Sequence, residues 1–115
     1  MKKEIAERWV AALRSGEYKQ GRHALRIGDA YCRMGVLCAI AVQDGAEVTH
    51  ATDANGVTFY DGNNAGLPSS VVIWAGMETC NGEWDPMERN LVARNDYGSS
   101  FRQIANTIEA NWERL

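Results

Sequence analysis

One apolar run, residues 31–42 with the sequence YCRMGVLCAIAV, constrains the fold of this chain more than any other feature. Only Arg33 and Gly35 interrupt it. A bilayer span takes about 20 apolar residues, so this run is too short to cross a membrane. Its length favours a helix over a strand. The sequence therefore predicts a central buried helix over residues 30–43, with Asp29 at its N-cap.

Three further helices are predicted from local signals. Residues 3–14 carry apolar side chains at helical spacing along one face. Residues 67–76 open with a proline near the first helical position and close with a glycine. Residues 100–115 begin with a capping box formed by Ser100 and Gln103, followed by an apolar stripe.

The remaining sequence predicts a small sheet. Asn55-Gly56 is a strong signal for a two-residue hairpin turn, because both residues accept positive φ. We expect the hairpin over residues 47–60. Residues 87–96 fit either a short helix or a third strand, and we favour the strand. The polar, glycine-containing segment 17–29 is expected to be a loop.

These elements predict an α+β fold in which about four helices pack around a small two- to three-stranded antiparallel sheet. At 115 residues, the chain has the length of one domain, spanning residues 1–115.

The charge distribution excludes a general nucleic-acid binder. The formal net charge is −3, whereas phosphate neutralisation needs clustered Lys and Arg. The charge is nevertheless uneven: residues 1–35 carry eight basic against four acidic side chains, and residues 36–115 carry four against eleven. A local basic surface near the N-terminus is therefore expected.

No secretory signal or membrane span is apparent, so we expect a cytoplasmic protein that does not bind membranes and has reduced thiols. Cys32 and Cys38 do not have the spacing of a zinc motif, and no metal site or cofactor is predicted. Cys32 near a helix start, with His50 on a strand, has the plan of a cysteine hydrolase. No oxyanion hole or third catalytic residue can be identified, so catalysis is the least favoured alternative.

A binding site is predicted in the basic segment. Lys19, Arg22 and Arg26 favour phosphate, and Tyr18 can stack on a base. The flexible Gly21 follows Gln20 and allows close approach of the backbone to a ligand.

The turn containing Asn95 and Asp96 precedes the last helix. We expect it to lie opposite the basic segment and to contact sugar or base hydroxyls of the ligand. The simpler interpretation of the basic segment is a solvated loop. The simpler interpretation of Asn95 and Asp96 is that they only stabilise the turn. Trp84, in a polar loop, is the best candidate for contact with a protein partner.

Several segments, taken in order, resemble a family of small uncharacterised proteins of tailed phages and prophages. The matching segments are W-V-x-A-L-R-S-G-x-Y-x-Q-G (Trp9–Gly21), Y-C-x-x-G-V-L-C (Tyr31–Cys38), L-P-x-x-V-x-x-W-x-G (Leu67–Gly76) and N-D-x-G-x-S-F-x-x-I-A (Asn95–Ala105). Arg33 and Ala39 depart from the pattern, where a second cysteine and an aspartate are common. The resemblance implies a phage setting and action in the host cytoplasm, and it brings no catalytic assignment.

The sequence thus predicts a non-catalytic phage-type accessory protein that sequesters a nucleotide-derived signal in counter-defence. The alternative is a module that binds a host enzyme through Trp84 and the acidic C-terminal half. The sequence leaves open whether the protein forms a homo-oligomer.

Overall fold

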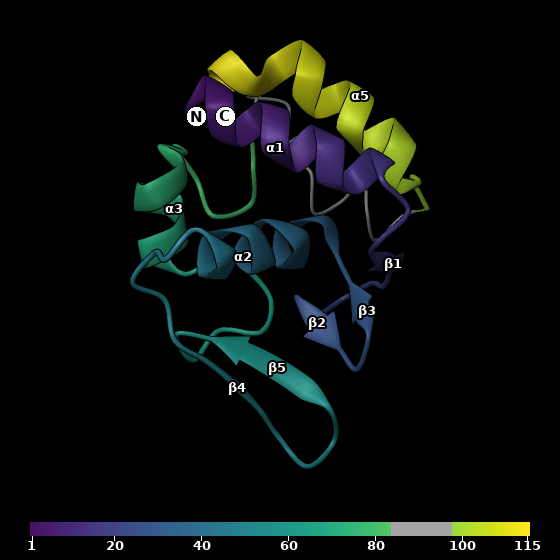
Figure 1. The fold of residues 1–115 in the computed structure, drawn as a ribbon, viewed down its shortest axis with the longest axis vertical. Coiled ribbons are helices and arrows are strands. Elements are labelled where there is room, and N and C mark those ends of the chain that lie inside the picture. Colours follow the sequence, from purple (N-terminus) through teal and green to yellow (C-terminus); the bar gives the residue numbers. More distant parts are fainter. Residues whose placement is uncertain (84–97) are drawn as a thin grey trace.

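A computed structural model describes residues 1–83 and 98–115 of the chain (Figure 1). The described helices are α1 (Lys3–Arg14), α2 (Arg33–Gln43), α3 (Ser69–Ala75) and α5 (Phe101–Asn111), and α5 continues into the 3-10 turn η1 (Trp112–Arg114). The described strands are β1 (Lys19–Gln20), β2 (Arg26–Ile27), β3 (Ala30–Tyr31), β4 (His50–Thr52) and β5 (Val57–Tyr60). The α+β class is confirmed.

The sheet differs from the prediction in size and direction. It has five strands in the order β1-β3-β2-β5-β4, and β1 is parallel to β3 while the other pairs are antiparallel. The predicted small antiparallel sheet is therefore wrong, because segment 17–29, expected to be a loop, contributes β1 and β2. Strands of two residues are too short to show an alternating pattern in the sequence.

The predicted hairpin and the predicted start of the last helix can be compared with the structure. Strands β4 and β5 form the predicted hairpin, but the predicted two-residue turn is wrong, because Asp53 already bonds to Val57 and the turn has three residues, 54–56. Gly56 has φ of 81°, whereas Asn55 does not have positive φ. The capping box of α5 is present, since the Ser100 side chain accepts from the Gln103 amide and the Gln103 side chain accepts from the Ser100 amide. The third expected strand, over residues 87–96, lies outside the described residues.

Helix α2 begins later than predicted. Cys32, not Asp29, is its N-cap, because Ala30 and Tyr31 are extended and pair with β2. The apolar run thus divides into a short strand and a buried helix. Its central position is confirmed, because the side chains of α2 from Arg33 to Cys38 are all buried.

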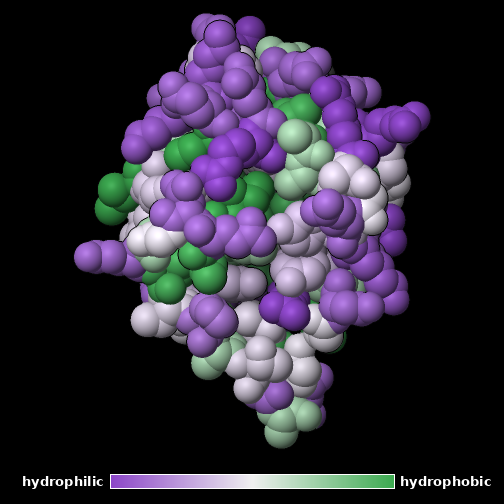
Figure 2. All heavy atoms as spheres, in the orientation of Figure 1, coloured by the Kyte–Doolittle hydropathy of each residue, from purple (hydrophilic) through white to green (hydrophobic). Residues whose placement is uncertain are grey.

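Helix α2 lies between a helical layer and the sheet. Helices α1 and α5 run side by side on one side of α2, and the strands lie on the other (Figure 1). The Trp9 side chain of α1 is fully buried and donates to the Arg33 carbonyl oxygen at 2.8 Å. Hydrophilic side chains cover much of the face seen in Figure 2, where hydrophobic atoms form separate patches.

Gly35 explains how closely α2 packs against the strand-forming segment. A Cβ at this position would lie 1.8 Å from the carbonyl oxygen of Leu25. That oxygen accepts the Cys32 amide at 3.1 Å, and the Leu25 amide donates to the Asn64 carbonyl at 2.7 Å. The contact therefore joins three chain segments at the first turn of α2. None of the described helices has the length and apolarity that crossing a membrane requires.

Candidate functional site

A row of side chains crosses the sheet on the face toward α2. Gln20, Tyr31, Arg26 and Thr58 are successive cross-strand partners, and such partners point to the same face. Because side chains alternate along a strand, Tyr60 lies on this face too. The sheet therefore brings a tyrosine and an arginine of the predicted loop region next to the hairpin.

A pocket of about 160 Å³ lies between this face and the C-terminal half of α2. We call it the sheet–helix pocket, and its lining residues are Arg26, Tyr31, Ala39, Val42, Gln43, His50 and Tyr60. Among residues 1–83 and 98–115, none that lines this pocket carries a carboxylate. The α2 side chains thus line one side of the pocket. The other side is formed by an arginine, two phenols and an imidazole.

Aromatic contacts fix the walls of the pocket. The Arg26 guanidinium carbon lies 4.8 Å from the centroid of the Tyr31 ring, and its Nε donates to the Gly28 carbonyl at 2.8 Å. The Tyr18 ring packs edge-on against Tyr31, with centroids 5.1 Å apart. Arg26 is therefore held over the Tyr31 ring, which is itself held by Tyr18. Because these side chains are ordered before a ligand binds, less conformational entropy is lost on binding.

The second tyrosine of the pocket is held in its neutral form. Burial is the main cause that raises the pKa of Tyr60 to about 12, and the nearby Cys38 and Tyr31 add to it. The hydrogen bond with Arg26 opposes this shift. At neutral pH Tyr60 is therefore an uncharged phenol, and Arg26 supplies the positive charge that favours an anion.

The imidazole of His50 stands at the mouth of the pocket. Its ring lies 6.1 Å from that of Tyr60 at an interplanar angle of 39°, and the residue is exposed. His50 and Tyr60 are direct partners in the β4–β5 ladder. A planar group entering the pocket would meet both rings.

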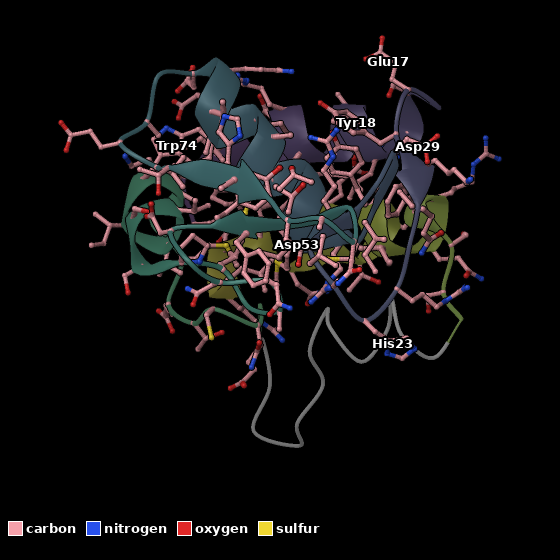
Figure 3. All side chains as sticks on the ribbon, turned by 90° about the horizontal axis from the view of Figure 1, so that it is seen from below. Glu17, Tyr18, His23, Asp29, Asp53 and Trp74 are labelled. Atoms are coloured by element: carbon pink, nitrogen blue, oxygen red, sulfur yellow. The ribbon has the colours of Figure 1, made fainter. Side chains whose placement is uncertain are left out.

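The structure brings only some of the predicted ligand residues together. Arg26 lines the sheet–helix pocket, and Tyr18 supports it through Tyr31. Lys19 is exposed on β1, and its Nζ lies 3.9 Å from an Asp29 carboxylate oxygen. Figure 3 shows Tyr18 and Asp29 on one side of the molecule and His23 on the opposite side.

Two further predicted ligand residues have other surroundings. The Gln20 side chain donates to the Ser99 carbonyl at 2.8 Å and accepts the Phe101 amide at 3.1 Å, so it fastens β1 to the start of α5. Arg22 is exposed on the segment between β1 and β2. Trp84, Asn95 and Asp96 lie outside the described residues.

Sequence reasoning missed Tyr31, Tyr60 and Gln43 as pocket residues. Tyr31 was counted with the apolar helix, since the end of β3 leaves no signal in the sequence. The hairpin signal at Asn55-Gly56 does not identify Tyr60, because a two-residue turn there would place Ala51 opposite Tyr60. The observed three-residue turn, 54–56, instead pairs Tyr60 with His50 and directs both to one face.

The cysteine-hydrolase pair predicted from the sequence is separated in the structure. His50 lines the sheet–helix pocket, whereas Cys32 lines a different cavity. Across residues 1–83 and 98–115, no group of three or more His, Cys, Asp or Glu side chains is arranged to hold a metal ion.

These features define a small α+β domain with an arginine-bearing aromatic pocket between its sheet and its central helix. The chain belongs to the family described as Domain of unknown function (DUF8296), whose family model matches residues 1–112. Neither the comparison with curated proteins nor that with solved structures found a match.

Proposed function

We propose that this protein is a non-enzymatic binding protein that holds a nucleotide-like anion at the sheet–helix pocket. The observation that carries the proposal is the position of Arg26, whose guanidinium sits over Tyr31 in a pocket that no carboxylate of the described part of the chain lines. Guanidinium groups bind phosphate through paired hydrogen bonds, and aromatic rings stack on bases.

The size of the pocket indicates that it encloses only part of the ligand. A volume of about 160 Å³ is well below the ~300–1,000 Å³ of pockets that enclose a drug-sized molecule. It suits one planar ring or one phosphate group. In this proposal Arg26 pairs with a phosphate inside the pocket, the base stacks on the exposed His50 ring at its mouth, and the rest of the ligand stays on the surface.

The biological role follows from the resemblance to small phage proteins. We infer that the protein acts in the host cytoplasm and removes a nucleotide-derived defence signal by sequestering it. Such a role requires tight binding and no chemistry, which agrees with a pocket built from rings and one cation. Lys19 and Arg22 lie outside the lining of this pocket, so the proposal assigns them no contact with the ligand.

Isothermal titration calorimetry with a panel of cyclic dinucleotides, AMP and ADP-ribose tests the proposal. Arg26→Ala should weaken binding of the best ligand at least tenfold, because a charge-assisted hydrogen bond contributes about 1.5–3 kcal/mol. Lys19→Ala is the matched control, since it removes an exposed cation outside the pocket, and it should change affinity by less than threefold.

Two outcomes contradict the proposal. One is the absence of heat from every ligand of the panel at tens of micromolar protein. The other is equal weakening by Arg26→Ala and Lys19→Ala, which would indicate non-specific attraction to a basic surface. His50→Ala provides a further check, because the proposal expects it to weaken ligands with a base and to leave inorganic phosphate unchanged.

A further inference from the structure

Strand β4 forms one edge of the sheet, and its outer side is open. All three of its residues, His50–Thr52, are exposed. Figure 1 shows the β4–β5 hairpin extending beyond the helices at one end of the molecule, with β4 on its outer side. A further strand can therefore reach this edge.

The hydrogen bonds of the hairpin show which backbone groups of β4 point outward. The Asp53 amide donates to the Val57 carbonyl at 2.9 Å, so these two residues form a hydrogen-bonded pair. In an antiparallel ladder such pairs alternate with non-hydrogen-bonded pairs, so Ala51 also bonds to β5. The amides and carbonyls of His50 and Thr52 therefore point away from β5, and within residues 1–83 and 98–115 no group bonds to them.

The opposite edge of the sheet, β1, is protected in a way that β4 is not. Lys19 places a charge on that edge, and Gln20 fastens the strand to the start of α5. Lysine, proline or a covering segment commonly prevents an edge strand from pairing with another chain. The sequence of β4, His-Ala-Thr, contains neither lysine nor proline, and none of the described helices covers it.

The outward groups of β4 are complementary to those of an identical strand. When a second copy lies antiparallel with Ala51 opposite Ala51, His50 of each chain lies opposite Thr52 of the other. Each of these pairs can exchange two hydrogen bonds, which satisfies every outward amide and carbonyl of both strands. The arrangement has twofold symmetry, so the same surface serves on both copies.

We propose that two copies of this chain pair through β4 and join their sheets across a twofold axis at Ala51. Main-chain pairing of edge strands is a common mode of recognition between chains. Only three residues of each chain take part, so the dimer is weak, with a dissociation constant on the order of 100 µM. This inference does not rest on the nucleotide-binding proposal.

The side chains on the face of the sheet away from α2 support this pairing. Ala51 and Phe59 are cross-strand partners on that face, and Ile27 and Val57 are partners beside them. Ile27 is 46% exposed, so this apolar surface is only partly covered within one copy. Pairing through β4 places the two Ala51 side chains against each other and continues the apolar surface into the second copy.

The dimer would also bring two sheet–helix pockets together. His50 lines the mouth of its pocket, and Thr52 of the second copy would lie directly opposite it. The two His50 residues would be diagonal neighbours, about 7–8 Å apart. A molecule held at one mouth would therefore contact the second copy.

Disulfide trapping without ligand tests the register. Opposed residues of a non-hydrogen-bonded pair have Cα atoms about 4.5 Å apart, which a disulfide can span. Ala51→Cys, in a chain whose exposed Cys80 is replaced by serine, should form a covalent dimer under mild oxidation. Ala54→Cys is the matched control, because this alanine is also exposed but its two copies would lie about 20 Å apart.

Non-reducing gel electrophoresis should find that Ala51→Cys cross-links at least tenfold faster than Ala54→Cys. Equal rates would overturn the proposed register. Because no ligand is present, this result is separate from the outcome of the calorimetric panel.

Sedimentation equilibrium from about 10 µM to about 1 mM protein measures the association itself. The wild type should approach the mass of two chains at the highest concentration. Ala51→Lys places two like charges opposite each other and should raise the dissociation constant at least tenfold. Ala54→Lys adds the same charge outside the contact and should change it less than threefold. A wild type that stays monomeric up to about 1 mM would overturn the proposal and leave β4 as an edge for a strand of another protein.

Discussion

Replacing Gly35 by alanine should destabilise the protein, although the same change in an open helix position stabilises it. Alanine is favoured over glycine in a helix interior by about 1 kcal/mol. At Gly35, however, the added Cβ would lie 1.8 Å from the Leu25 oxygen and 2.7 Å from its carbonyl carbon. Contacts below 3.0 Å are essentially never made by a Cβ, so helix and strand segment must separate by about 1 Å.

The magnitude follows from what this separation breaks. Overpacking of a core costs about 1–3 kcal/mol. The displaced Leu25 carbonyl also accepts the Cys32 amide, and losing that buried bond costs about 1 kcal/mol more. After the gain in helix propensity is subtracted, we expect the free energy of unfolding to fall by about 2 kcal/mol or more.

Urea unfolding followed by tryptophan fluorescence measures this loss, with Trp9 as a buried reporter. Ala39→Gly is the control in the same helix, since it tests propensity at a half-buried position and should cost about 1 kcal/mol. A Gly35→Ala protein as stable as the wild type, or more stable, would refute the close approach of α2 to Leu25. Because Leu25 precedes Arg26, the variant should also weaken ligand binding at the sheet–helix pocket.

Three other predictions concern hydrogen bonding and ionisation. Hydrogen bonds from two hydroxyls and a backbone amide lower the pKa of Asp61 below 3.8. The ionised carboxylate therefore stabilises the fold above that pH, and this contribution is lost as the pH falls through the folded-state pKa. Thermal melting from pH 6 to pH 2 should show that Asp61→Asn loses less stability on acidification than the wild type. The pKa of Tyr60 is raised from 10.0 to about 12, so stability should fall as the pH rises through that interval, and ultraviolet titration should find a late-ionising phenol that Tyr60→Phe removes. Gln20→Ala should lower the free energy of unfolding by about 1–2 kcal/mol, because the Ser99 carbonyl and Phe101 amide lose their partner, and an unchanged urea midpoint would contradict this role.

The sequence predicts those elements whose signals are local. The helix at residues 3–14 follows from its apolar stripe, and the start of α5 follows from the capping box. The existence of the hairpin follows from Asn55-Gly56, although its turn has three residues, 54–56, with positive φ at Gly56 and not at Asn55. In each case the decisive interaction lies within a few residues along the chain, so the pattern is sufficient.

The sheet and the pocket depend on contacts that no local pattern encodes. Strands β1, β2 and β3 have two residues each. Strands β2 and β3 pair locally across Gly28-Asp29, but their other neighbours, β1 and β5, lie further away along the chain. The turn after β2, for example, is joined to the hairpin by the Gly28 amide, which donates to the Gly56 carbonyl at 2.8 Å. Arg26 could be recognised as a cation from the sequence, but its position over Tyr31 follows only from the register of these strands.

The contacts of Gln20 and of helix α1 have a consequence for how the chain is made. The partners of Gln20 lie 79 and 81 residues later, and the Met1 amino group donates to the Trp112 carbonyl across 111 residues. The apolar face of α1 packs on α5 as well as on α2. Helix α1 can therefore pack on α2 early, but it reaches its full set of contacts only after Phe101–Asn111 have been synthesised. A chain truncated before Phe101 should unfold at a lower urea concentration than the full sequence, because α1 then lacks one of its two helical neighbours.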